Sequence, residues 1–182
     1  MKAQVIFLIW SVVSVQKSNG NSGIEMFILR IDDRLIHGQV VAGWARPLGI
    51  EELIIASDTI SKDGWACSAY RLAVPENIVF NCFDIGTCVR YLKEGMDKKR
   101  IMIVVDKVID AYNLVRNGLV INEIYIGGLS YREGARSIAP FIYLVPEDIE
   151  ALVKLHEMGI KVTGKQLPNS QPIDVIKKLT GV

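Results

Sequence analysis

The most informative segment of the sequence is Leu29-Arg30-Ile31-Asp32-Asp33-Arg34-Leu35-Ile36-His37-Gly38-Gln39. An apolar run from Met26 to Ile31 stops at two acids and an arginine, and one of the two histidines in the chain follows. Beyond the glycine, apolar residues return at helical spacing, at Val40, Val41 and Trp44. The pattern predicts a strand, a short charged loop and a helix. Because chemistry in open α/β sheets collects at the carboxyl ends of strands, a functional site is expected in this loop.

Apolar runs along the rest of the chain predict further strands. They lie at residues 52–56, 78–80, 100–105, 123–126, 141–144 and 160–162. Helical patterns separate them or follow the last one, at 61–73, 84–92, 108–117, 146–158 and 173–179. Because strands alternate with helices, the sequence predicts an α/β fold, a single open, mostly parallel sheet of about seven strands with helices on both faces.

The helix that Pro146 opens carries the second histidine. Its apolar spacing is expected to turn Ile149, Leu152, Val153 and His156 inward. His156 is then a packed histidine in the last turn, where the negative end of the helix dipole favours it, and it has no catalytic role.

Length and composition fit one folded domain. The chain has 182 residues, of which half are apolar and 23% are charged. A net charge of +1 gives no basic field for nucleic acid. We expect the domain at 26–182, and we interpret residues 1–25 as a leader or an added extension outside the fold. The apolar run Val5–Trp10 is too short for the ~20 residues that span a bilayer, and a secretory signal peptide is the alternative.

The cysteines suggest neither a disulfide framework nor a zinc site. Cys67, Cys82 and Cys88 are odd in number and form no C-x-x-C pair. A reducing cytoplasm is therefore the simpler expectation for this chain.

His37 is the candidate nucleophile of the loop. A helix N-terminus disfavours imidazolium, so a ring nitrogen stays free near neutral pH. A phosphoryl group on that nitrogen would meet backbone N–H donors of the loop and helix. Arg34 could add a two-pronged contact to its oxygens, and Gly38 would allow a close approach of the backbone. The alternative is structural, a partly buried histidine that binds a loop carbonyl.

The neighbours of His37 are candidates for support. Asp32 or Asp33 could hold Arg34 or fix the tautomer of His37, and their alternative role is capping of the loop and helix. Gln39 is either part of the site or a solvated residue of the first turn. The loop from Gly127 and Gly128 to residue 134 either shapes the rim of the phosphoryl site or is only a tight turn.

The segment from Arg30 to Val40 resembles the R-I-D-D-R-L-I-H-G-Q-V signature of a known family. This family comprises the mannose/sorbose-family enzyme IIB components of the bacterial phosphoenolpyruvate-dependent sugar phosphotransferase system (PTS). The resemblance extends from about Met26 to the C-terminus. Its shorter pieces are Trp44, Ser57-Asp58, Ala73-Val74-Pro75, Gly127-Gly128-Leu129 with Gly134, and Glu147-Asp148-Ile149.

The resemblance implies that His37 accepts a phosphoryl group from the phosphohistidine of a IIA protein or domain. His37 then gives this group to a sugar that enters through the membrane components IIC and IID, with Arg34 helping to bind it. The activity is that of a protein-N(pi)-phosphohistidine–sugar phosphotransferase, in the cytoplasm at the membrane permease. Transfer between histidines conserves a high-energy N–P bond, so positioning and charge stabilisation are needed and no metal or other cofactor is expected.

Some positions depart from the family pattern. Residues 65–67 are Trp-Ala-Cys where many relatives carry basic residues, and Tyr125 stands where asparagine is common. Asp106 and Lys107 replace a more usual polar pair after the fourth predicted strand. All of them are expected on the rim of the site, where they would affect the partner surface.

A receiver-like module for phospho-signalling or regulation, without sugar transfer, is the alternative function. Asp32 and Asp33 end the first predicted strand, Asp58 ends the second, and Lys107 follows the fourth. Receivers phosphorylate an aspartate, and here the acid and the lysine follow the wrong strands. A nucleotide-binding Rossmann enzyme is disfavoured because neither G-x-G-x-x-G nor a P-loop motif is present.

Overall fold

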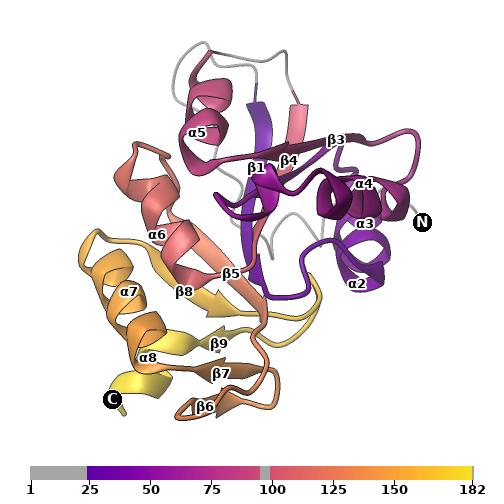
Figure 1. Ribbon diagram of the computed structural model, residues 1–182. Coiled ribbons are helices and arrows are strands. Elements are labelled where there is room, and N and C mark those ends of the chain that lie inside the picture. Colours follow the sequence, from indigo (N-terminus) through magenta and orange to yellow (C-terminus); the bar gives the residue numbers. More distant parts are fainter. Residues whose placement is uncertain (1–23, 95–98, 182) are drawn as a thin grey trace.

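The computed structural model describes residues 24–94 and 99–181, and its centre is a twisted sheet (Figure 1). Seven strands lie side by side in the order β3-β2-β4-β1-β5-β8-β9, and in this described part every neighbouring pair is parallel except β8–β9. The strands are β1 (Ile24–Asp32), β2 (Glu52–Ala56), β3 (Val79–Phe83), β4 (Lys99–Val105), β5 (Glu123–Gly128), β8 (Lys161–Gly164) and β9 (Ile173–Asp174). The predicted fold class is confirmed.

Helices cover both faces of the sheet, as predicted (Figure 1). One face carries a helical run made of α2 (Gly38–Val40), the π-helical η1 (Val41–Ala45) and α3 (Arg46–Leu48), together with the 3-10 turn η2 (Ile60–Lys62) and α4 (Gly64–Ala73). The other face carries α5 (Ile85–Lys93), α6 (Val108–Arg116), α7 (Pro146–Glu157) and α8 (Val175–Thr180). A hydrophobic core lies on each face of the sheet, and β4 contributes side chains to both. Ile101 and Ile103 pack on one face and Met102 and Val104 on the other, because successive side chains of a strand point to opposite faces.

Among the described residues the main sheet has seven strands, as the sequence predicts, but one of its strands is not the predicted one. The run predicted at 141–144 is β7 (Ile142–Leu144), which pairs antiparallel with β6 (Arg136–Ala139) in a separate hairpin. The seventh place in the main sheet belongs to the two-residue strand β9, where a helix was predicted to begin. A short apolar run does not reveal which sheet it joins, and two residues carry no periodicity.

The helical run after His37 contains a π turn that the sequence prediction did not include. Pro47 has no N–H to donate to the carbonyl of Gly43, and its ring would clash with that carbonyl in a regular α-helix. The wider turn relieves this clash, and Arg46 N–H bonds instead to the carbonyl of Val41. A proline inside an otherwise helical pattern was therefore the signal for this turn.

The predicted inward face of α7 is partly wrong. Leu152 is buried and Ile149 packs against the core, but Val153 and His156 are exposed. Ala151 and Leu155 complete the buried stripe instead. The stripe begins with Asp148, whose carboxylate accepts a hydrogen bond from Val145 N and pairs with Arg132, so its first position is polar and the pattern was misread.

The expectation of no disulfide is also wrong. Cys67 in α4 and Cys82 in β3 form a disulfide, with Cα atoms 6.2 Å apart. Cys88 is a free, buried thiol, and burial raises its pKa to about 12. The cysteines therefore give no support to a reducing compartment.

In the segments 24–94 and 99–181, no helix combines the length and the apolar character that crossing a membrane requires. The predicted leader at 1–25 lies almost entirely outside these residues, and β1 begins at Ile24.

Candidate functional site

The charged loop leaves the carboxyl edge of the sheet between two neighbouring strands. Asp33 N–H donates to the carbonyl of Gly128 at the end of β5, and Asp33 Oδ2 accepts from Ser130 N at 2.6 Å. Leu35 adopts a left-handed backbone conformation (φ 52°), and its N–H donates to Asp32 O at 2.9 Å. Such a conformation costs a leucine about 1–2 kcal/mol, and burial of Leu35 and Ile36 in the core offsets it. The loop is therefore a tight turn held at both ends.

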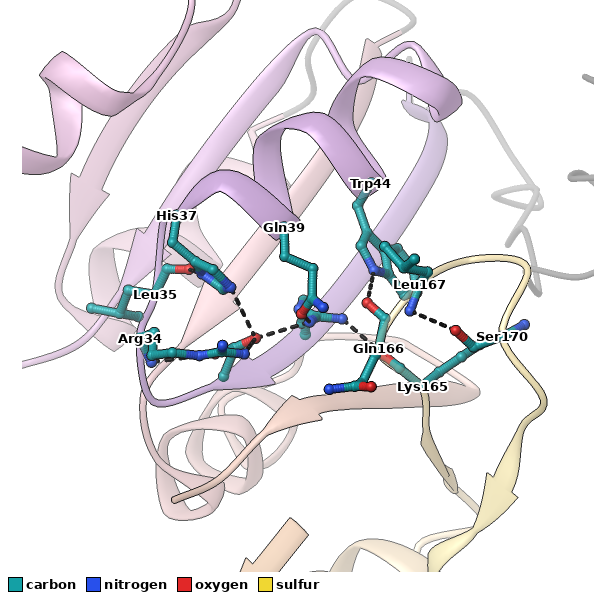
Figure 2. A network of polar contacts seen from close by, with 11 residues as sticks. Arg34, Leu35, His37, Gln39, Trp44, Lys165, Gln166, Leu167 and Ser170 are labelled. Atoms are coloured by element: carbon teal, nitrogen blue, oxygen red, sulfur yellow. Dashed lines mark hydrogen bonds and ion pairs between the residues drawn. The ribbon is translucent and has the colours of Figure 1, made fainter. Parts of the chain in front are cut away.

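His37 stands at the first position before the helical run (Figure 2). Its Nδ1 lies 2.9 Å from Leu35 O, and because a carbonyl oxygen can only accept, Nδ1 carries the proton. Its Nε2 lies 3.9 Å from Asp32 Oδ2, is buried and has no hydrogen-bond partner among the described residues. The side chain as a whole is 22% exposed. The tautomer is therefore fixed by a loop carbonyl, the contact that the structural alternative named, and not by Asp32 or Asp33.

Asp32 holds Arg34, which leaves Asp33 with a different role. The Asp32 side chain is completely buried, and its oxygens accept from Arg34 Nε at 3.1 Å and from Arg34 Nη2 at 3.3 Å. Arg34 itself is 49% exposed. Asp33 instead ties the loop to the residues after β5 through Ser130.

The glycine pair at the end of β5 makes room for two arginines. A Cβ on Gly127 would overlap the guanidinium of Arg30, and a Cβ on Gly128 would come within 2.8 Å of Arg34 Nη2. Gly38 has nothing within 4 Å of such a Cβ, so the space beside the first helical turn is open. The three predicted glycines thus lie beside the site. At Gly127 and Gly128 any larger residue would collide with the Arg30 or Arg34 guanidinium.

The sequence prediction missed Arg30 and the segment 165–170. Arg30 is completely buried, and burial lowers its pKa against the opposing effect of Asp32. The Nη2 of Arg30 donates to Asp32 Oδ2 at 2.8 Å and to Gln39 Oε1 at 3.2 Å, and its Nη1 donates to Lys165 O at 3.0 Å. The signal for Arg30 was a charge inside an apolar strand, but the segment 165–170 carries no comparable signal.

Trp44 lines the same corner (Figure 2). Its ring lies under the Arg30 guanidinium, with Cζ 5.1 Å from the ring centroid, and its Nε1 donates to Gln166 O at 2.7 Å. A Cβ on Gly43, one residue before it, would collide with Leu167 of this segment. The helical run and residues 165–170 therefore close over Arg30 together.

The expected rim positions are not all on the rim. Tyr125 is buried, and its hydroxyl donates to Glu123 Oε2 at 2.9 Å, so this expectation is wrong. Trp65 is 90% exposed on α4. After β4, Asp106 is half-buried and Lys107 is exposed.

The arrangement suits a transferable oxyanion. The same edge of the sheet carries the His37 ring, the half-exposed Arg34 guanidinium and the N–H groups of the first helical turn, which begins at Gly38. In the described part of the protein, no side chain caps that turn. Groups of at least three His, Cys, Asp or Glu side chains that could hold a metal ion do not occur among the described residues.

The sequence profile of the PTS system sorbose subfamily IIB component matches residues 26–181. The chain belongs to this family. The match covers most of the chain and includes the loop of His37, which confirms the resemblance seen in residues 30–40. It does not favour the receiver-like alternative.

Individual relatives agree with the family assignment. The sorbose-specific EIIB component of Lacticaseibacillus casei is 25% identical over 156 residues, which cover 85% of this chain and 95% of the relative. The mannose-specific EIIAB component of Escherichia coli (strain K12) is 28% identical over 163 residues. These residues cover 87% of this chain and 50% of the relative, so the chain spans about half the length of that relative.

Solved structures show the same fold. The IIBSor domain of the sorbose permease from Klebsiella pneumoniae superposes with a TM-score of 0.76 at 25% identity, covering 85% of this chain and 96% of that chain. An N-acetyl-galactosamine IIB component from Streptococcus pyogenes gives a TM-score of 0.79 at 29% identity, covering 88% and 99%.

Proposed function

We propose that this chain is a phosphoryl carrier in bacterial sugar uptake. His37 accepts a phosphoryl group from a phosphorylated IIA protein or domain and transfers it to a sugar that enters through membrane components IIC and IID. One observation supports this most strongly, the position of His37 at an uncapped helical turn with the half-exposed Arg34 beside it. The family and the names of its members, which include sorbose- and mannose-specific components, support the same role.

The transfer steps balance without a cofactor. In the first step the P–N bond to the donor histidine breaks as a P–N bond to His37 forms, and the electron pair of the broken bond stays on the donor nitrogen. In the second step a sugar hydroxyl oxygen attacks the phosphorus, the P–N bond to His37 breaks with its electron pair returning to the His37 nitrogen, and the hydroxyl proton passes to solvent water. The charge on the three equatorial oxygens is stabilised by Arg34 and by the N–H groups of the first helical turn.

We propose Nδ1, the N(pi) nitrogen, as the phosphoryl acceptor. Nε2 is buried and lies 3.9 Å from a carboxylate oxygen of Asp32, which would repel a phosphoryl dianion. For Nδ1 to react, the ring must turn away from Leu35 O, Nδ1 must lose its proton, and Nε2 must gain one. The protonated Nε2 is then a donor, for which a nearby carboxylate such as Asp32 is a favourable partner. Long-range ¹H–¹⁵N NMR of the phosphorylated ring tests this assignment, and phosphorus on Nε2 would contradict it.

We place the chain in the cytoplasm at the membrane permease, and we assign the folded domain to 26–182 together with residues 24 and 25, which belong to β1, and residues 1–23 to a leader outside it. The family match at 26–181 supports these bounds. A chain shortened to begin at Ile24 is expected to unfold at the same temperature as the full chain and to accept the phosphoryl group at the same rate. A large loss of stability would show that the leader is part of the fold.

Phosphoryl labelling tests the function. The purified chain is mixed with labelled phosphoenolpyruvate, the general phosphotransferase proteins and candidate IIA proteins. Label is expected on the wild type and on the control His156→Ala, whose side chain is exposed, and not on His37→Ala. The label should be lost in acid and retained in alkali, as for a phosphohistidine. Failure to label the wild type with any IIA protein, or full labelling of His37→Ala, would overturn the proposal.

A further inference from the structure

Two arginines of opposite exposure share one buried carboxylate. Arg30 is completely buried and Arg34 is 49% exposed, and both donate to the oxygens of Asp32, which is itself completely buried. The three side chains come from the end of β1 and the first residues of its loop. Their different surroundings suggest different tasks.

Arg34 is the arginine that can change partners during the reaction, because its side chain is half-exposed. In the present structure its Nε and Nη2 are both directed at Asp32. If the same face of the guanidinium makes a two-pronged contact with a phosphoryl group on His37, it gives up at least one of these contacts. If Arg34 were the only counter-ion, its departure would leave a buried carboxylate unpaired, which is strongly unfavourable.

Arg30 has no such freedom. Its guanidinium is enclosed by Asp32, by Gln39 Oε1, by Lys165 O, by the Trp44 ring and by the backbone of Gly127. The side chain has no exposed surface through which it could reach a bound phosphoryl group. It therefore remains at Asp32 whatever Arg34 does.

We propose that Arg30 is a positioning residue for phosphoryl transfer, the permanent counter-ion that keeps the Asp32 carboxylate in place while Arg34 moves to the phosphoryl group. The inference rests on the proposed function. The Asp32 oxygen that Arg30 binds, Oδ2, is also the one 3.9 Å from His37 Nε2. Arg30 thus sets the position of the carboxylate that faces the ring.

Three variants of the full chain test the charge argument. Arg30→Met should lower the rate of phosphoryl transfer at saturating phospho-IIA by roughly 10–100-fold, as loss of a supporting contact does, with little change in the half-saturating IIA concentration. Arg30→Lys should recover part of the rate. The double variant Arg30→Met/Asp32→Asn should unfold at a higher temperature than Arg30→Met alone, because it removes the unpaired buried charge. Arg100→Met, at the opposite end of the sheet, is the matched control and should transfer at the wild-type rate.

NMR on the wild type gives a result that does not depend on the folding of a variant. On phosphorylation, the Nε–H signal of Arg34 should shift strongly, whereas the side-chain signals of Arg30 should keep the shifts of its hydrogen bonds to Asp32 and Lys165 O. A static Arg34, or an Arg30 released from Asp32, would overturn the inference, as would a double variant no more stable than Arg30→Met. If the wild type takes up no label at all, the proposed function fails first, and the two failures are distinguishable.

Discussion

Gly127→Ala tests how tightly Arg30 is built into the fold. The added methyl would overlap the Arg30 guanidinium, which also lies over the Trp44 ring. Arg30 would have to move and lose its contacts with Asp32 Oδ2 (2.8 Å), Lys165 O (3.0 Å) and Gln39 Oε1 (3.2 Å). Breaking one side of a buried ion pair costs about 3–5 kcal/mol.

This loss is large against the total stability of a domain, about 5–15 kcal/mol. For a chain of this size it corresponds to a fall in Tm of roughly 6–20 °C. The free energy of unfolding is measured by chemical denaturation, and Tm by a thermal scan. Gly64→Ala is the matched control, because an added Cβ there meets nothing within 4 Å and the residue begins α4. Its stability should stay the same or rise by up to ~1 kcal/mol. A Gly127→Ala protein as stable as the wild type would refute the packing of Arg30 described above.

Three further predictions concern the site and its surroundings. Arg34→Ala should slow phosphoryl transfer by about 10²–10³-fold with the fold intact, since Arg30 still pairs with Asp32; a normal single-turnover rate would contradict this role. Gly128→Ala should disturb only the flexible end of Arg34, so transfer should slow while the denaturation midpoint changes little, and an unchanged rate would count against the contact. Asp110→Asn addresses a carboxyl whose pKa is raised to about 6, first by burial and then by Asp106. The folded pKa lies above that of an unfolded aspartate, so the folded state holds the proton longer and wild-type stability falls as pH rises from about 4 to about 6. The variant should therefore be more stable than the wild type at pH 7 by roughly 2–3 kcal/mol, with a smaller difference at pH 5; equal stability at both pH values would contradict the assignment.

Short-range patterns in the sequence were enough to predict the strand, the loop and the helix around His37. The apolar run, the two acids and the helical spacing all lie within about twenty residues, and the loop is built from that local information. The choice between Asp32 and Asp33 was left open because both precede Arg34 and either could turn toward it. The backbone settles the choice, since Asp33 is drawn to the Ser130 N–H while Asp32 faces inward.

Contacts between distant segments could not be predicted. The enclosure of Arg30 needs Gly127 and Lys165, which come from elements about 100 and 135 residues further along the chain. The disulfide between Cys67 and Cys82 depends on α4 lying against an edge strand, and no local motif announces it. Strand β9 exists only because β8 offers it a partner. In each case the determining interaction is tertiary, so patterns along the sequence did not contain it.

The most direct measurement is the location of the phosphoryl group on the wild-type chain. The protein is phosphorylated by phospho-IIA, digested under alkaline conditions that preserve phosphohistidine, and mapped by mass spectrometry. The account predicts phosphate on the peptide that contains His37, and its disappearance when the sugar and the membrane components are added before digestion. Phosphate on Asp58, Asp106 or any other residue, with His37 unmodified, would contradict it.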